Sequence, residues 1–180
     1  MEKVLSFSYS PNGKQIVFSG VAKGQTDLYL YNPIGNTQKK ITDDIYSDLS
    51  PKFLNNNGEI VFASNRNNDS LNIEHERSNF ATDMDIFLLD LKKENKISSI
   101  TDTDNEEELF PFGLKVRIIY HQNKNGRIKR FTAKFDSTVS HIDTIVHYNY
   151  FYNSENIGAY ELNPTSINGN TNSSQLSQIY

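Results

Sequence analysis

Two segments of the chain contain the same short motifs in the same order, and this internal repeat restricts the fold more than any other feature. Residues 7–19 and 49–64 each contain a Ser-Pro pair, a turn rich in Asn and Gly, and an Ile-Val-Phe run that ends in a small residue. An Asp that opens an apolar and aromatic run follows at Asp27 and Asp85, and an Ile-Thr-Asp run closes both copies. The spacing grows from 40 residues at the Ser-Pro pair (10 to 50) to 58 at the Asp (27 to 85), which predicts an insertion around residues 65–84.

Each copy predicts a short sheet of four antiparallel strands. Asn-Gly turns supply the positive φ angles of tight hairpins, and Pro11 and Pro51 are expected where strands begin, because a missing N–H costs little there. The Ile-Val-Phe runs are apolar on both sides, as in a sheet that lies between two others. Four strands per unit, repeated every ~40 to 60 residues, are typical of a propeller blade. The sequence therefore predicts an all-β chain of four-stranded antiparallel blades, a partial β-propeller with about three blades, in preference to an open sandwich.

The predicted boundaries follow from these two copies and a weaker third one. The third copy opens at residues 109–112, lacks the Asn-Gly turn and continues through residue 120. We predict a partial propeller over residues 1–162, with blade units at 5–43, 48–102 and 108–146 and the start of a further unit at 147–162. Residues 163–180 are rich in Asn, Ser, Thr and Gln, which predicts a polar, disordered tail or linker.

The motifs resemble a known repeat family. Residues 10–19, the Asp-x-Tyr-x-Tyr run at 27–31 and the Ile-Thr-Asp run at 41–43 together resemble the TolB-type (WD-like) β-propeller repeat, and the resemblance covers residues 5 to 120. It implies a periplasmic or cell-surface protein that binds other proteins, with a peptidoglycan-associated lipoprotein as a plausible partner class. It also implies an alternative, the substrate-gating propeller of a prolyl-oligopeptidase-type serine peptidase.

Three blades do not close a propeller, which typically needs four to eight. An open arc would leave apolar sheet faces and unpaired strand edges in water. We therefore expect this chain to be a fragment of a longer protein, or else to close its ring by self-association. No apolar signal region follows Met1, and the fragment interpretation accounts for that.

Composition and missing motifs disfavour most catalytic functions. The chain has no cysteine, so disulfides, thiolate zinc sites and a cysteine nucleophile are excluded. A net charge of −4 disfavours nucleic-acid binding, and no apolar run approaches the ~20 residues that span a bilayer. Neither a Gly-x-Ser-x-Gly nucleophile elbow nor a glycine-rich phosphate loop occurs. We predict no catalytic residue, cofactor or metal ligand, and no enzymatic activity for this chain.

Two groups of residues resemble metal-binding sites, and we predict that neither group binds a metal ion. The acidic run at 102–108 has oxygen ligands at alternating positions but lacks the glycine of a calcium loop, which favours a solvated turn. His141, Asp143 and His147 share one parity, but on a continuous strand the two histidines would lie roughly 20 Å apart. Ordinary strand histidines are the favoured interpretation.

The remaining predictions concern recognition and blade geometry. The basic residues at 124–134 alternate with apolar ones as on a solvated strand, which disfavours a single-strand nucleic-acid groove. The insertion is the better candidate for recognition, through Glu74, His75, Glu76 and Arg77. Positions predicted to fix blade geometry are Ser10, Pro11, Gly13, Ser50, Pro51, Gly58, Asp27, Asp85, Thr42 and Thr101. The predicted function is a non-catalytic binding or scaffold module that recognises a protein or glycan through rim loops.

Overall fold

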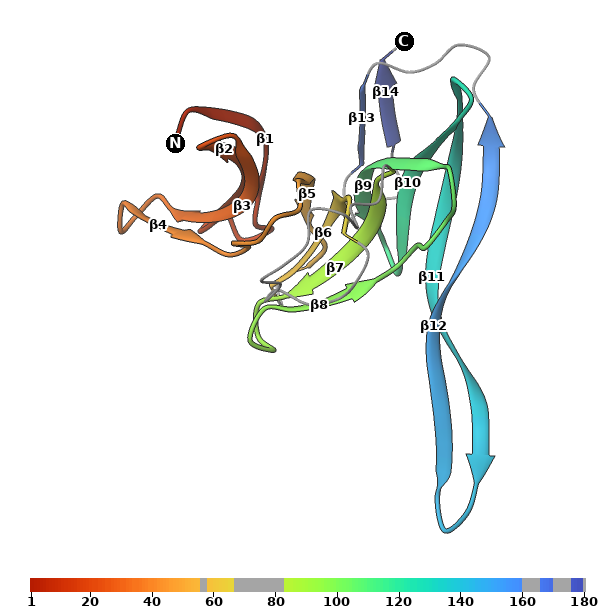
Figure 1. Ribbon diagram of the computed structural model, residues 1–180. Helices are drawn as coiled ribbons and strands as arrows, with labels where there is room; N and C mark the ends of the chain where they lie inside the picture. Colours follow the sequence, from red (N-terminus) through yellow and green to blue (C-terminus); the bar gives the residue numbers. More distant parts are fainter. Residues whose placement is uncertain (56–57, 67–82, 160–165, 170–175, 180) are drawn as a thin grey trace.

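The chain forms three four-stranded antiparallel sheets that follow one another along an arc (Figure 1). A computed structural model describes residues 1–55, 58–66, 83–159, 166–169 and 176–179. No helix that is both long and apolar enough to span a bilayer occurs among the described residues. The all-β class and the partial propeller with about three blades are confirmed.

The first two sheets have strands in sequence order, as simple meanders. The first contains β1 (Lys3–Tyr9), β2 (Ile16–Ala22), β3 (Gln25–Asn32) and β4 (Thr37–Lys40). The second contains β5 (Asp48–Phe53), β6 (Glu59–Ser64), β7 (Asp85–Asp90) and β8 (Lys96–Ser99). The third contains β9 (Glu107–Leu114), β10 (Arg117–Lys124), β11 (Arg127–Ile142) and β12 (Val146–Ala159), and a separate pair contains β13 (Ser166–Gly169) and β14 (Leu176–Ile179).

Two apolar clusters hold the three sheets together. Val17 and Leu28 of the first sheet pack with Ile60 and Phe62 of the second. On the other side of the second sheet, Val61 belongs to a cluster that joins it to the third sheet. Because neighbouring residues of a strand point to opposite faces, the Ile-Val-Phe run of β6 fills both clusters at once. This is why the run is apolar throughout.

Backbone pairing aligns the repeats differently from the Ser-Pro motif. The N–H of Ser10 donates to the carbonyl of Gln15 at 2.8 Å, and the N–H of Leu54 donates to that of Glu59 at 2.8 Å. Ser10 is therefore equivalent to Leu54, and the first half of each unit has a constant spacing of 44 residues (10 to 54). Pro11 lies in the turn that follows β1, rather than at a strand start as expected.

The structural counterpart of Ser50-Pro51 is Phe110-Pro111 in the third sheet. Ser50 and Phe110 have φ angles of 52° and 54°, and each lies in a β-bulge of the innermost strand. Pro51 thus lies inside β5. Because the bulge leaves this position unpaired, the sheet loses no hydrogen bond to the missing N–H of proline. The two Ser-Pro pairs therefore occupy different structural positions.

The third unit extends further than the sequence predicts. β12 pairs with β11 as the outer strand of the third sheet, so residues 147–159 belong to that sheet and do not begin a new one. The segment predicted as a disordered tail contains β13 and β14, which pair with each other, and β13 lies beside β9.

A long hairpin extends away from the body of the third sheet (Figure 1). The last residue of β11 that pairs with β10 is Lys134, opposite Arg117. Beyond it, β11 pairs with β12 alone. We call residues 135–152 the projecting hairpin.

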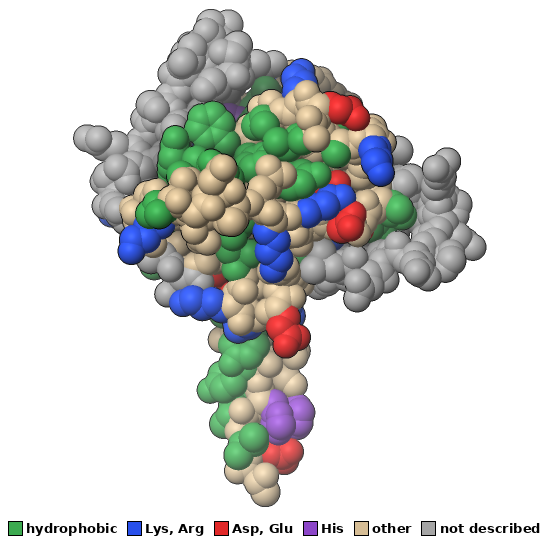
Figure 2. Space-filling view, turned by 90° about the vertical axis from the view of Figure 1, so that its left-hand side faces the viewer, with side chains coloured by type: hydrophobic (Ala, Val, Ile, Leu, Met, Phe, Trp, Pro, Cys, Tyr) green, Lys and Arg blue, Asp and Glu red, His purple; other side chains and the backbone are tan. Residues whose placement is uncertain are grey.

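The outer face of the first sheet is open. Val4, Leu5, Phe7 and Tyr9 of β1 are 43–58% exposed. Figure 2 views the molecule from this side and shows hydrophobic side chains over the body, with the projecting hairpin extending away from it. Apolar surface of this kind marks a contact face in many proteins.

Candidate functional site

The paired Thr residues predicted from the repeat lie between sheets. The hydroxyl oxygen of Thr42 accepts a hydrogen bond from the Leu28 N–H at 2.9 Å, and that of Thr101 accepts one from the Ile86 N–H at 2.8 Å. Both Thr side chains are buried. Each ties the end of one unit to its third strand, next to the residues that begin the following unit. The two residues thus make the same hydrogen bond in both units.

The Asp residues of the repeat differ in their partners. Asp27 is buried and lies 2.7 Å from the ammonium group of Lys40, yet burial raises the pKa of its carboxyl. Asp85 accepts hydrogen bonds from the Thr101 hydroxyl and from the Thr103 N–H, both at 3.1 Å.

The glycines of the repeat fix turns. Gly13 and Gly58 have φ angles of 69° and 85°, which favour glycine. The Ser10 hydroxyl accepts from the Gln15 N–H at 2.9 Å and donates to the Asn12 side chain at 2.8 Å, which closes the first turn. The predicted recognition residues Glu74, His75, Glu76 and Arg77 lie outside the described residues.

A buried cluster around Arg66 was not predicted from the sequence. This guanidinium is 1% exposed and contacts Asp48 at 2.8 Å and Asp44 at 3.2 Å. Burial raises the pKa of both carboxyls, and the positive charge of Arg66 partly offsets this rise. The available signal for this cluster was an arginine two residues after Ser64, the last residue of an apolar strand.

The third sheet places Glu108 where the second has Asp48. Both carboxylates are fully buried directly before the bulge. Glu108 accepts hydrogen bonds from Thr103 at 2.6 Å and Gln122 at 2.9 Å, and no described arginine lies against it. Burial raises the pKa of Glu108 to about 8. The neighbouring carboxyl of Asp85 also raises the pKa of Glu108, which favours its protonated form.

An open groove of about 940 Å³ lies between the second and third sheets. Leu54 and Leu88 of the second sheet line it together with Ile118, Ala133 and Tyr152 of the third. Around these apolar residues its charged lining is mainly basic, and consists of Lys93, Lys96, Lys115, Arg117, Glu59 and Asp90. An apolar floor with a positive rim suits a ligand that is partly apolar and partly acidic.

One face of the projecting hairpin continues from this groove. We call it the aromatic face, and it consists of Phe135, Val139, Ile142, Val146, Tyr148 and Tyr150, which are 42–71% exposed. Phe135 stacks on Tyr150 with ring centroids 5.6 Å apart, and it meets Tyr152 edge-on at 5.4 Å. None of the six side chains carries a charge. The groove and the aromatic face form one candidate binding surface.

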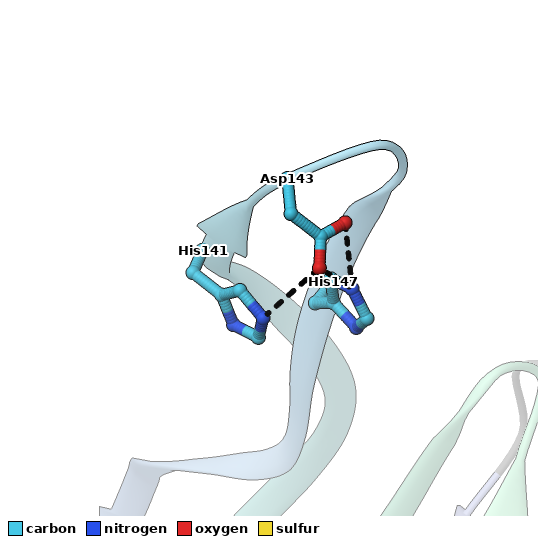
Figure 3. A group of neighbouring side chains, drawn as sticks. All are labelled: His141, Asp143 and His147. Atoms are coloured by element: carbon cyan, nitrogen blue, oxygen red, sulfur yellow. Dashed lines mark hydrogen bonds and ion pairs between the residues drawn. The ribbon is translucent and has the colours of Figure 1, made fainter.

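The opposite face of the hairpin is polar apart from Phe151 near its base, and it carries His141 and His147 near the tip (Figure 3). The prediction that these histidines lie roughly 20 Å apart on one strand is wrong, because the chain reverses between them. They lie directly opposite each other on β11 and β12, with ring centroids 4.1 Å apart. The carboxylate of Asp143 lies 3.2 Å from His147 Nε2 and 3.9 Å from His141 Nε2.

The acidic run at 102–108 makes contacts within the protein. Glu106 pairs with Lys124, and Glu108 is buried between the sheets.

Comparisons with known proteins give short sequence matches and longer structural ones. No family model matches the chain. It is 37% identical to the Tol-Pal system protein TolB of Helicobacter hepaticus over 57 residues, which cover 32% of this chain and 14% of that protein. It is 32% identical to dipeptidyl-peptidase 5 of Porphyromonas endodontalis over 68 residues, which cover 34% of this chain and 10% of that protein. The chain thus matches a small part of each relative's length.

The structural matches span all three sheets. A TolB structure from Agrobacterium tumefaciens superposes with a TM-score of 0.58 at 13% identity, over 89% of this chain and 61% of that one. TolB from Acinetobacter baumannii superposes with a TM-score of 0.54 at 14% identity, over 89% and 45%. The chain has the fold of a TolB-type β-propeller in partial form, and it spans less than two thirds of either solved chain.

Proposed function

We propose that this chain is a non-catalytic, protein-binding propeller module of a TolB-like envelope protein. The observation that carries the proposal is the aromatic face of the projecting hairpin. Exposed Tyr and Phe side chains are typical of the centre of protein interfaces, where a few aromatic anchors supply most of the affinity. No side chain of this face is charged, which suits an apolar protein surface better than a nucleic acid or an anionic membrane.

The groove at the base of the hairpin restricts the partner further. Its lining has four cationic side chains and two acidic ones around an apolar floor. We infer a partner that places apolar side chains against Phe135 and Tyr150 and acidic side chains near Lys96 and Arg117. The groove and the aromatic face therefore replace the loop of the insertion as the preferred docking element. A peptidoglycan-associated lipoprotein is the partner class to test, because the fold matches TolB proteins and one relative belongs to the Tol-Pal system.

Calorimetric titration of the chain with a purified peptidoglycan-associated lipoprotein tests this proposal. Replacing Phe135 and Tyr150 by Ser should weaken binding by at least ~30-fold, because interface aromatic anchors contribute about 2 kcal/mol or more. The matched control replaces Thr138 and Asn149 by Ala on the polar face of the same hairpin, and it should bind as the wild type does. Failure of the unmodified chain to bind would refute the partner class.

Sedimentation of the chain alone tests whether a second copy of the chain covers the aromatic face. If the wild type dimerises and the Phe135→Ser/Tyr150→Ser variant is monomeric, a second copy covers the aromatic face, and the proposal of a different partner fails.

A second function is favoured by the match to dipeptidyl-peptidase 5. In that case the blades would belong to a serine peptidase and would control the entry of peptides to a separate catalytic domain. The intact mass of the endogenous polypeptide, combined with a peptidase assay on the purified species, distinguishes the two. A larger species that hydrolyses dipeptidyl substrates would favour the peptidase.

A further inference from the structure

We propose that His141, Asp143 and His147 bind one divalent transition-metal ion at the tip of the projecting hairpin. One ligand atom from each of the three side chains lies within 4.8 Å of the others. Zinc bonds of about 2.1 Å to nitrogen or oxygen place tetrahedral ligand atoms about 3.4 Å apart. The distances from Asp143 Oδ2 to the two Nε2 atoms, 3.2 and 3.9 Å, bracket that value.

The local backbone brings the two imidazoles together. Up to Val139, opposite Tyr148, the strands pair in one register, and continuing it would place Ser140 opposite His147. A bulge between Val139 and His141 shifts the register by one residue, so that His141 comes to lie opposite His147. The rings are parallel to within 7°. The bulge thus aligns both nitrogens on the polar face.

The turn holds the carboxylate of Asp143 between the rings. Its Oδ1 accepts the N–H of Ile145 at 2.9 Å, which fixes the side chain in the three-residue reversal between β11 and β12. Its other oxygen, Oδ2, lies 3.2 Å from His147 Nε2 and 3.9 Å from His141 Nε2, so it faces both rings. The site therefore exists before any ion binds.

The ligand types select the class of ion. Two imidazoles with one carboxylate suit Zn²⁺, Cu²⁺ or Ni²⁺, whereas Ca²⁺ and Mg²⁺ require mostly oxygen ligands. Three protein ligands leave a fourth position of a tetrahedral ion open. All three side chains are 38–60% exposed, so water or a group of another molecule can reach that position.

Calorimetric titration of the untagged chain with Zn²⁺ at neutral pH tests the proposal. We expect one equivalent to bind to the wild type, and His147→Asn to weaken that binding by more than about tenfold, since even the loss of an outer-shell partner costs about 10–100-fold. The matched control exchanges two residues, as His147→Asn/Asn149→His. It keeps the composition and the polar face, but it moves one imidazole about 7 Å along the strand, and it should bind as weakly as His147→Asn.

Two results would overturn the proposal. Wild-type affinity in the exchange variant would mean that any two histidines on the hairpin suffice. Loss of binding in His75→Gln, at a histidine outside the described residues, would place the ion elsewhere. Electron paramagnetic resonance of the Cu²⁺ form gives an independent test, because the site requires two coordinated imidazole nitrogens. Equal thermal midpoints of the ion-free proteins would show that the variants are folded, since the tip is exposed.

Discussion

Replacing Arg66 by Ala should destabilise the chain more than the loss of any exposed charge. The guanidinium is buried and contacts Asp48 at 2.8 Å and Asp44 at 3.2 Å. Removing one partner of a buried ion pair leaves an uncompensated charge in the protein and costs about 3–5 kcal/mol. All three side chains are at most 1% exposed, so solvent screens this interaction little. For a chain of this size the cost corresponds to a fall of about 10 °C in Tm.

The pH dependence separates the loss of charge from the loss of packing. Burial already raises the pKa of Asp48, and the charge of Arg66 opposes that rise. Without Arg66 the pKa rises further, so Asp48 is protonated at a mildly acidic pH and ceases to be a buried charge. The difference in unfolding free energy between wild type and variant should therefore be smaller near pH ~5 than near pH ~8.

Thermal unfolding at both pH values, followed by circular dichroism, measures these effects. Arg127→Ala removes an exposed arginine from β11 and is the control, expected to change stability by less than about 0.5 kcal/mol. If Arg66→Ala melted together with this control, the argument from burial would be refuted. An equal loss at both pH values would mean that packing around Arg66, and not the two acids, causes the effect.

Three further predictions concern the repeat. In a urea titration, Gly58→Ala should lower the free energy of unfolding by about 1–2 kcal/mol, because φ is 85° and Leu91 Cβ would lie 3.3 Å from the added methyl group. Gly35→Ala is the control and should cost less, because the nearest atom to its added methyl group is 3.6 Å away. Thr101→Val should cost about 1–3 kcal/mol in the same assay by removing the acceptor of the Ile86 N–H, and Thr101→Ser should retain most of the stability. Glu108 has a pKa of about 8 in the folded chain against an ordinary 4.5, so its contribution is full below the ordinary value and is lost as pH rises through the folded value. Glu108→Gln should flatten that decline in unfolding curves from pH ~5 to ~9, and an unchanged slope would contradict the assignment.

The strands could be predicted from the sequence because their apolar runs repeat. The Ile-Val-Phe runs fill two cores at once, and no solvent-facing strand needs such a pattern. The alignment of Ser10-Pro11 with Ser50-Pro51 failed because a Ser-Pro pair fits two backbone settings. One follows a strand as part of a turn, and the other lies in a bulge with a φ of 52° at Ser50. Only the hydrogen-bond pairing with the neighbouring strand distinguishes the turn from the bulge.

The cluster of His141, Asp143 and His147 could not be predicted, because the turn between the histidines lacks the usual signal. Residues 143–145 contain neither Gly nor Pro, and the reversal is stabilised by the Asp143 side chain acting on the Ile145 N–H. The apolar residues on both sides therefore suggested one continuous strand. A single-residue bulge, which leaves no mark in the sequence pattern, then decides which side chain faces His147.

Each of the two junctions between sheets buries an acid at the equivalent position, and the two acids are stabilised in different ways. At the first, Asp48 is compensated by the charge of Arg66, 2.8 Å away. At the second, Glu108 is held by hydroxyl and amide donors and binds a proton. Raising the pH through about 8 therefore adds charge to the second junction. Because the projecting hairpin grows from the third sheet, the junction that carries it is the one whose buried acid has its pKa raised to about 8, and it has no described arginine against that acid.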